Sequence, residues 1–494
     1  MALVPLNLKA GFYRNGTEFD ASNRWRDGSL VRWRDGSLRP IGGWQERKVG
    51  FCTNPVRGSH AWESNNGTSY FAGGSYNELT AMTDGGVCYT ITPTVMSTGR
   101  EDAAQNLGFS GGAYGTGYFG TPRPSTGTYS EATTWSLDNY GQFLVGVHYD
   151  TGNLVEWQLG SSSVAAVVAN APTNNLGLVV TEERFIFLTG AGGDPRKVQW
   201  CDKEDNTTWT PAATNEAGDI TLQTSGQIMQ ALKTRGQTLI ITDTDAHSAK
   251  YIGPPYVYGF NRVGTSCGAV SRHSAVDTDM GVFWMGQRGF FAFDGNTVKE
   301  IPCEVHDYIF DDINTNQQSK IWAFNNVEFS EVWWFYPSST STEIDRYIAI
   351  DLLESHWLIG NLSRTSGTPR GVFQRPYLTG HDSDTDLFEH ESGTNYDSGS
   401  VFCETGPISI ANGDQISKVI DVIPDEKTQG DVDLKFKTRF YPNAAETTHG
   451  PFNPSNPTSV RFSGRQVRMR VEGDQLTNWR VGTMRLDTIA GGKR

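Results

Sequence analysis

Cysteine is scarce in this 494-residue chain, and its spacing excludes several kinds of site. No two cysteines form a CxxC pair, and no Cys and His residues stand at the spacing that zinc requires. We therefore expect no metal site and no disulfide framework, but reduced thiols in a protein that folds in the cytoplasm. The six cysteines are Cys52, Cys88, Cys201, Cys267, Cys303 and Cys403.

Long apolar runs are also missing. Nowhere do eighteen apolar residues follow one another, so the chain has no candidate for a membrane-spanning helix. The first residues, MALVPLNLKAGFYRNG, contain neither an apolar run of seven residues nor a small-residue cleavage site. We expect no membrane insertion and no export by a signal peptide.

Charged residues make up only 19% of the chain, and their signs are unevenly distributed. Residues 1–60 contain ten Lys and Arg against five Asp and Glu, and residues 461–494 contain eight against three. The residues between them contain 23 against 47, which leaves both ends near +5 and the middle near −24. Because proteins that hold nucleic acid neutralise its phosphates with Lys and Arg, we expect no stable grip on DNA by the bulk of the chain.

Glycine and aromatic residues are abundant, which favours a mainly β fold of short strands and tight turns. The chain has 55 Gly and 57 aromatic residues. Short apolar strands recur at intervals of roughly 40 to 55 residues, the length of a four-stranded propeller blade. We predict a β-propeller over residues 61–403. Representative strands begin at Tyr70, Phe143, Phe185, Leu239, Val282, Val332 and Leu387.

One interval is longer than the others and contains residues 93–133, which are rich in Gly, Ser, Thr and Tyr. This stretch has no apolar periodicity of either kind, so we predict an inserted loop or irregular extension that a compact blade does not need. Insertions of this kind often carry the function of a β scaffold, here as a tip or as a contact loop.

An octapeptide occurs twice in succession, as RWRDGSLV at residues 24–31 and RWRDGSLR at residues 32–39. Each copy places Asp-Gly between residues suited to strands, at Asp27-Gly28 and Asp35-Gly36. Asp-Gly fits a two-residue turn that requires positive φ. We predict a small β-meander that forms an N-terminal docking segment over residues 1–60.

From about residue 404 the pattern changes to long alternating strands, such as residues 418–423, 431–440 and 466–471. A period of two indicates strands with one buried and one wet face, so we predict a separate β-sandwich, or platform domain, at residues 404–494. Several of its cations share a strand face, which is either a solvated surface or a docking surface for an acidic partner. The candidate docking residues comprise two from the N-terminal segment and five from the end of the chain: Arg24, Arg32, Arg461, Arg465, Arg468, Arg470 and Arg480.

Motifs that could support catalysis are weak. Residues 264–268 match the GxSxG pattern around Ser266, but no helical pattern follows them, as an α/β-hydrolase requires. Asp382, Asp384 and Asp386 resemble the start of a calcium loop, yet Leu387 occupies the position where such a loop needs glycine. We predict no catalytic, cofactor-binding or metal-binding residues and no enzymatic activity.

The clustered aromatics of residues 333–336 favour a blade interior over a platform for sugars or bases. The sialidase-type aspartate box is approached near Asp138 and Asp205 without being completed. Two carboxylates from different blades could still face one sugar, as glycoside hydrolysis requires, because sequence spacing does not exclude that arrangement.

The two octapeptides, together with PIGGW at residues 40–44, resemble segments of phage tail proteins of the nozzle, or tail tubular protein B, family. The same resemblance extends to GRQVRMRVEG at residues 464–473, WRVG at residues 479–482 and RLD at residues 485–487. It covers both ends and, loosely, the order of elements between them. None of these motifs has a catalytic meaning.

The resemblance implies a propeller with platform domains, assembled as a homohexamer in the tail tube of a short-tailed bacteriophage. Its partners would be the portal adaptor, the tail fibres or spikes, and a distal needle or plug, and viral DNA would pass through its axial channel. The localisation implied is the virion tail, after assembly in the host cytoplasm. An acidic wall suits this role because it repels phosphates instead of holding them.

Two other functions remain open. The abundant Trp and scattered Asp residues also fit a receptor-binding or polysaccharide-degrading propeller of the same tail. A cellular propeller scaffold is disfavoured because no WD or kelch signature is present.

Overall fold

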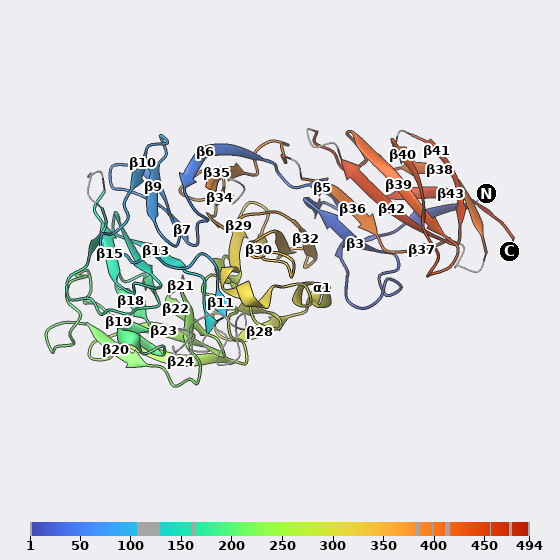
Figure 1. Cartoon of the computed structure of the whole chain (residues 1–494). Helices are drawn as coiled ribbons and strands as arrows, with labels where there is room; N and C mark the ends of the chain where they lie inside the picture. Colours follow the sequence, from blue (N-terminus) through green and yellow to red (C-terminus); the bar gives the residue numbers. More distant parts are fainter. Residues whose placement is uncertain are drawn as a thin grey trace, which may run out of the picture.

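The computed structural model describes residues 2–105, 129–159, 164–380, 385–397, 399–410, 415–454, 456–473 and 477–492. Figure 1 shows an elongated molecule with two β domains side by side, a propeller and a sandwich, and both chain termini at the far end of the sandwich. The mainly β fold class predicted from the sequence is confirmed, and the propeller is the larger domain.

Within the described residues the propeller has seven blades, each a four-stranded antiparallel sheet. The first strands of successive blades contact one another in a closed ring, and the first strand of the last blade contacts that of blade 1. Blades 1 to 3 consist of β7 (Ser59–Glu63), β8 (Ser69–Gly74), β9 (Leu79–Thr83) and β10 (Cys88–Thr90); β13 (Trp135–Tyr140), β14 (Phe143–His148), β15 (Leu154–Trp157) and β16 (Ala166–Val167); and β17 (Gly177–Val180), β18 (Ile186–Thr189), β19 (Lys197–Trp200) and β20 (Gly218–Thr221).

The remaining blades follow the same up-and-down order, except the last. Blades 4 to 6 consist of β21 (Ile228–Thr234), β22 (Gln237–Thr242), β23 (Asp245–Gly253) and β24 (Val257–Thr265); β25 (Ala275–Thr278), β26 (Gly281–Met285), β27 (Phe290–Phe293) and β28 (Val298–Ile301); and β29 (Trp322–Asn326), β30 (Glu331–Tyr336), β31 (Arg346–Asp351) and β32 (Trp357–Asn361). Blade 7 joins β33 (Ser366–Thr368), β34 (Tyr377–Thr379) and β35 (Thr385–His390) to β6 (Trp44–Cys52) from the start of the chain. The ring is therefore closed by pairing between segments that are more than 300 residues apart in the sequence.

Apolar side chains hold the blades together, because five hydrophobic clusters each lie between two neighbouring blades. Trp135, Leu144 and Trp157 of blade 2 pack against Trp62 and Tyr70 of blade 1. Further clusters of the same kind join blades 2 and 3, 3 and 4, 4 and 5, and 7 and 1. Residues 333–336, predicted as blade interior, are almost completely buried in β30.

The sandwich is built from both ends of the chain, not from residues 404–494 alone. One sheet has the order β1 (Ala2–Leu6), β43 (Met484–Ala490), β38 (Ser417–Pro424) and β41 (Thr458–Gly464). The second contains β2 (Lys9–Phe12), β3 (Arg24–Ser29), β36 (Phe402–Thr405), β42 (Gln466–Gly473), β39 (Val432–Arg439) and β40 (Thr447–Phe452), with β37 (Ile408–Ser409) paired to β42. Apolar residues such as Phe436, Met469 and Leu486 fill the space between the sheets.

The predicted N-terminal meander over residues 1–60 differs from what the structure contains. Residues 2–29 belong to the sandwich, β4 (Val31–Arg34) and β5 (Ser37–Pro40) form a hairpin at the junction, and β6 belongs to blade 7. The hairpin has the predicted turn, since Asp35 and Gly36 have φ values of 51° and 68°.

The first octapeptide contains no turn at its Asp-Gly pair. Asp27 and Gly28 lie inside β3 and pair with Glu404 and Cys403 of β36. A Cβ atom at Gly28 would lie 2.4 Å from the ring of Phe12, so this glycine allows a close approach of strands instead of a turn. Tertiary pairing thus overrides the local preference of an identical heptapeptide.

The described parts of the predicted insertion lie on one face of the propeller. β11 (Ala104–Gln105) pairs with β12 (Tyr129–Ser130), and residues 106–128 between them lie outside the described residues. Asp102 accepts a hydrogen bond from Lys320, which lies in the segment after blade 5. Glu131 accepts one from Arg272, which lies in the segment after blade 4. Lys320 ends the short helical turn η2 (Thr315–Lys320), which follows the one-turn helix α1 (His306–Phe310); a third short turn, η1 (Ala191–Gly193), lies in blade 3.

Candidate functional site

The two predicted docking arginines of the octapeptides are used inside the molecule. Arg24 on β3 places Nη2 2.6 Å from Oε2 of Glu304, which follows blade 5, so this ion pair joins the sandwich to the propeller. Arg32 on β4 is buried, and its guanidinium lies 3.0 Å from Glu331 and 2.6 Å from Glu391. A partner protein cannot reach Arg32 in this structure, which corrects its assignment as a docking residue.

The burial of Arg32 is compensated by several contacts. The guanidinium stacks 3.7 Å above the ring of Phe329. Burial by itself lowers the pKa of Arg32, but the carboxylates of Glu331 and Glu391 outweigh burial and raise that pKa above its ordinary value. Burial raises the pKa of Glu331 to about 6, although Arg32 opposes that rise. Glu391 also accepts hydrogen bonds from the backbone of Gly42 and from Asn326. We call Arg32, Glu331 and Glu391 the junction triad.

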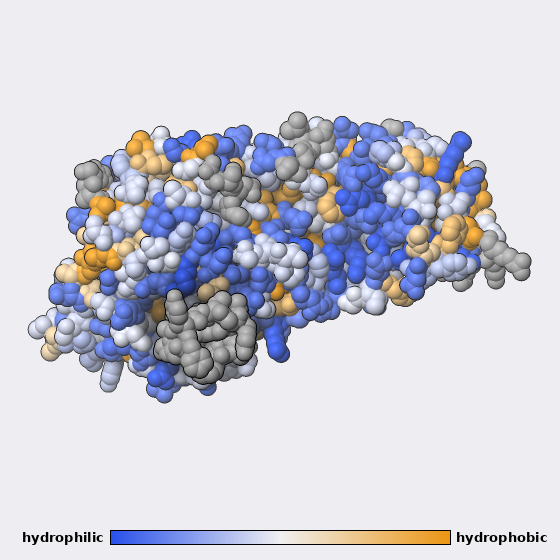
Figure 2. Space-filling view, viewed as in Figure 1, coloured by the Kyte–Doolittle hydropathy of each residue, from blue (hydrophilic) through white to orange (hydrophobic). Residues whose placement is uncertain are grey.

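Arg468 and Arg470 lie on the outer face of β42, as their even spacing predicts. Both approach Glu404 on the neighbouring β36, with N–O distances of 3.5 and 3.3 Å. Arg468 also binds Glu18 and Glu446, and Arg470 stacks 3.7 Å above the ring of Phe402. Figure 2 shows a hydrophilic surface over the part of the sandwich nearest the propeller. Acidic residues of the same domain thus already pair with this cluster.

The other three predicted docking arginines lie apart from that cluster. Arg461 on β41 is exposed and its Nε contacts the hydroxyl of Ser459 at 3.2 Å. Arg465 lies 5.3 Å from the ring of Tyr441, and Arg480 is half-buried beside the strand pairing of Gln429. Arg461 is the only one of the seven that is exposed, so it is the accessible cation of the predicted docking face.

A second candidate site is a cleft of about 550 Å³ between blades 4 and 5. It opens where the hairpin between β22 and β23, the hairpin between β26 and β27, and the link from β24 to β25 come together. Hairpins and inter-blade links at one end of the strands are where propellers carry variable surface residues. The lining includes Ser225, Asp243, Thr244, Asp245, Arg262, Thr265, Ser266, Gly268, Gln287, Arg288, Phe291 and Glu300.

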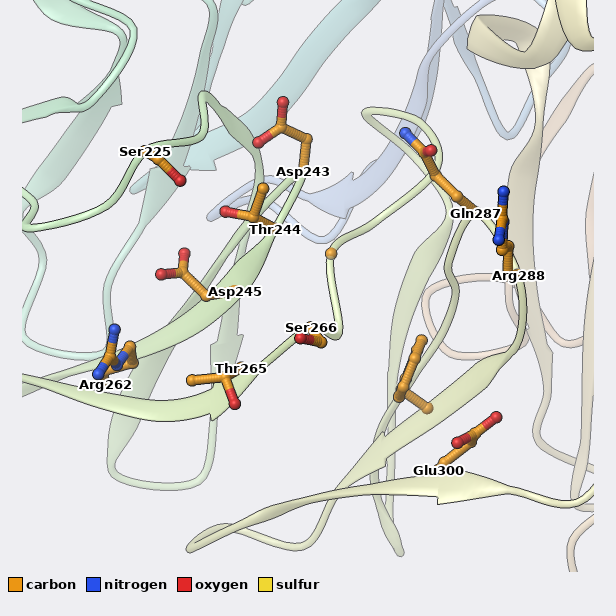
Figure 3. A pocket seen from close by; sticks show the side chains of 12 residues that line it. Ser225, Asp243, Thr244, Asp245, Arg262, Thr265, Ser266, Gln287, Arg288 and Glu300 are labelled. Atoms are coloured by element: carbon orange, nitrogen blue, oxygen red, sulfur yellow. The ribbon is translucent and has the colours of Figure 1, made fainter.

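Figure 3 shows the two walls of this cleft. Asp243, Asp245 and Arg262 stand on one side, Gln287, Arg288 and Glu300 on the other, and Ser266 lies between them. The cleft therefore offers carboxylate acceptors and guanidinium and amide donors from two blades at once.

The carboxylates of the first wall are held by local hydrogen bonds. Asp245 Oδ1 accepts bonds from the hydroxyls of Thr242 at 2.6 Å and Thr224 at 2.9 Å. Asp243 Oδ1 accepts the backbone N–H of Gln227 at 3.0 Å, and burial raises the pKa of Asp243. The hydroxyl groups keep Asp245 oriented, while Asp243 holds a proton more readily than an ordinary aspartate.

The GxSxG pattern around Ser266 lies in this cleft, but its glycines have structural roles. Gly268 approaches the backbone of Asp243 so closely that a Cβ atom would lie 2.0 Å from its carbonyl, and Gly264 packs against Val298. Ser266 has a φ of 57°, which is unusual for a residue with a side chain. A strand, not a helix, follows in the next blade, so the nucleophile elbow of α/β-hydrolases is absent from residues 264–278.

The remaining sequence motifs fall outside the cleft. Asp382 and Asp384 lie outside the described residues, and Asp386 accepts the backbone N–H of Gly50 in blade 7. Asp138 accepts the backbone N–H of Val180, and Asp205 orders its own turn through Thr207 and Thr208. No group of three His, Cys, Asp or Glu residues within the described part of the chain is arranged to hold a metal ion.

Sequence reasoning did not single out Asp243, Asp245, Arg262, Arg288 or Glu300. The available signal was the acidic TDTD run at residues 242–245 directly after an apolar strand. Its counterpart across the cleft comes from another blade, and only the fold brings the two together.

No family model matches the chain, and no curated protein matches it. Among solved structures, it is similar to virginiamycin B lyase from Staphylococcus aureus, at 8% identity and a TM-score of 0.44, over 70% of this chain and 98% of that one. It is also similar to the WD40 domain of Neurospora crassa Pan2, at 7% identity and a TM-score of 0.41, over 72% of this chain and 96% of that one. A luciferin-regenerating enzyme matches at 9% identity and a TM-score of 0.33, over 53% of this chain and 91% of that one.

These likenesses concern the propeller fold alone. The ring of four-stranded sheets makes this chain a β-propeller-type protein. The sequence-based expectation that it has no enzymatic activity is corrected here, because the propellers that it resembles include a lyase and a luciferin-regenerating enzyme. We withdraw that expectation. No helix in the described part of the chain is long and apolar enough to cross a membrane.

Proposed function

We propose that this chain is a ring-forming subunit of the tail nozzle of a short-tailed bacteriophage. The observation that carries the proposal is that the sequence segments resembling the nozzle family meet in space. Leu38 of the second octapeptide exchanges two backbone hydrogen bonds, of 2.8 and 2.9 Å, with Val481 of the WRVG motif. The first octapeptide forms β3 in the same sheet as β42, which contains the RQVRMRV motif. The resembling segments thus make one structural unit.

The charge distribution also supports a ring. Residues 44–390, which contain the propeller, have 21 Lys and Arg against 38 Asp and Glu, a net charge of −17. The rest of the chain has 20 against 17, a net charge of +3. A closed ring of identical subunits needs two different, complementary surfaces on each subunit, and an acidic propeller beside a weakly basic sandwich can provide them. The channel of such a ring would lie between subunits and would repel DNA.

The proposed partners follow from the same role. Six copies form the ring, the portal adaptor binds one side of it, and fibres or spikes attach around it, with a needle or plug at the distal end. Viral DNA passes through without a stable complex, because the acidic surface gains little from phosphate contacts. The protein is located in the virion tail.

Electron microscopy of the purified full-length protein and of the virion tests the proposal. We expect six-fold rings with an axial channel, and we expect added salt to weaken ring assembly because surface charges are screened. A monodisperse monomer at all salt concentrations, absent from tail particles, would remove the proposal.

A second candidate function is a receptor-binding or polysaccharide-degrading propeller of the tail. The polar cleft between blades 4 and 5 favours it, because its walls present carboxylates and guanidinium groups from two blades. The test is incubation of the protein with host capsule and measurement of bound polysaccharide and released reducing ends. If the protein neither binds any capsule of the host nor releases reducing ends from it, this candidate is removed.

A further inference from the structure

The cleft between blades 4 and 5 contains several hydrogen-bonding side chains that have no partner within the described residues. Arg262, Ser266, Gln287, Arg288 and Glu300 make no side-chain hydrogen bond or ion pair there, and all five are exposed at the cleft. Elsewhere in the propeller, arginines close to carboxylates are paired with them, as Arg272 is with Glu131. The unpaired groups of the cleft are therefore available to a ligand, and they include both donors and acceptors.

The composition of the walls indicates the ligand chemistry. Asp243, Asp245 and Glu300 can accept hydrogen bonds from a ligand, and Arg262 and Arg288 can donate them. Bonds from a ligand to these charged groups are charge-assisted. A hydroxyl group can both donate to a carboxylate and accept from a guanidinium. A ligand with hydroxyls along its length can satisfy both walls, while an apolar molecule would leave them unsatisfied at a cost in free energy.

Charge argues against an anionic ligand. The cleft has three carboxylates against two guanidinium groups, and the propeller around it has a net charge of −17. A phosphate or a polyanionic sugar would meet repulsion from both. The volume of about 550 Å³ falls in the range of small-molecule sites, and Phe291 adds an aromatic side chain to the lining.

We infer that this cleft binds a short uncharged oligosaccharide, with Arg262 and Arg288 donating to its oxygens and Asp245 and Glu300 accepting from its hydroxyls. The inference deepens the second candidate function and rests on it. It does not require ring assembly.

The full-length protein is tested on an array of short uncharged hexose oligosaccharides and of uronate-bearing and sulfated oligosaccharides of equal length. The strongest uncharged binder is then titrated by calorimetry against the wild type, Arg262→Gln and Arg288→Gln. Each substitution removes a charge-assisted hydrogen bond, so we expect binding to weaken by at least about tenfold. Both residues are exposed, which leaves the fold intact.

The matched control is Arg235→Gln. Arg235 is an exposed arginine in the hairpin at the opposite end of blade 4, 3.5 Å from Asp279, and its loss leaves binding unchanged if the cleft is the site. Stronger binding of the anionic sugars or absence of binding to every uncharged sugar would overturn the inference. So would binding by Arg262→Gln and Arg288→Gln that equals binding by the wild type. If the micrographs show rings but no sugar binds, the nozzle proposal stands and the cleft inference fails. If a monomer binds the sugar, the cleft inference stands and the nozzle proposal fails.

Discussion

The junction triad gives a prediction with a defined magnitude. Arg32→Met keeps most of the apolar stem but removes the guanidinium, and with it three contacts of 2.6, 3.0 and 3.1 Å to Glu391 and Glu331. Two buried carboxylates are then left without their cation. Breaking a buried ion pair in this way costs about 3 to 5 kcal/mol of unfolding free energy. We expect Arg32→Met to be destabilised by about that amount at pH 8.

The pH dependence provides a second measure. Burial raises the pKa of Glu331 to about 6 when Arg32 is present, and without Arg32 that pKa rises further. A carboxyl whose pKa is higher in the folded state than in the unfolded state binds protons preferentially when folded, so acid favours folding. The deficit of Arg32→Met relative to wild type should therefore be smaller at pH 5 than at pH 8.

The assay is urea unfolding followed by tryptophan fluorescence, with hydrogen exchange of residues 31–40 to detect loosening of the junction. Arg39→Met is the matched control, because Arg39 lies in the same hairpin with Asp35 at 3.4 Å, and the Asp35 side chain is 80% exposed. We expect this exposed pair to contribute less than about 1 kcal/mol. If Arg32→Met cost no more than Arg39→Met, or if its cost were the same at both pH values, the reasoning about the triad would be wrong.

Three further predictions concern the fold. Gly28→Ala should destabilise the sandwich because its methyl group would meet Phe12, whereas Gly36→Asn, at the hairpin turn, should be nearly neutral; comparing their urea midpoints tests this. Trp334→Ala should cost about 3 to 5 kcal/mol, since its ring is fully buried against Phe290 of the adjacent blade, and calorimetry of the propeller transition measures the loss. Burial lowers the pKa of His273 to about 4 from an ordinary 6.5, so the unfolded chain binds this proton before the folded chain does. As the pH falls from 6.5 to 4, protonation of His273 should therefore lower the free energy of unfolding by about 3 kcal/mol. His273→Gln should lack that part of the pH profile, and an unchanged profile would contradict the assignment.

The periodicity of the sequence predicted the propeller well, because each blade repeats the same local chemistry. The predicted strands at Tyr70, Phe143, Leu239, Val282 and Val332 all fall in the second strand of successive blades, where both faces are buried and the sequence is most apolar. The strand predicted at Phe185 falls in the same position of blade 3, one residue before β18 begins. Short outer strands such as β16 gave no signal, since two exposed residues show no pattern.

Long-range pairing could not be predicted in the same way. Nothing in the local sequence of residues 44–52 indicates that they pair with residues 385–390, or that residues 2–29 join a sandwich with the end of the chain. The cleft was missed for the same reason, because Asp245 and Arg288 are ordinary surface residues until two blades bring them together. The docking arginines were chosen by charge, and Arg32 was misassigned because its carboxylate partners lie about 300 or more residues away.

The closure of blade 7 by β6 has a consequence for synthesis. β6 leaves the ribosome early, but its partner β35 is translated more than 300 residues later, and β43, which pairs with β1, later still. Neither domain can be completed during most of translation, so nascent chains must keep two unpaired strand edges from joining other molecules. Truncation of either end would leave one such edge permanently open, which makes aggregation, not partial activity, the expected fate of shortened chains.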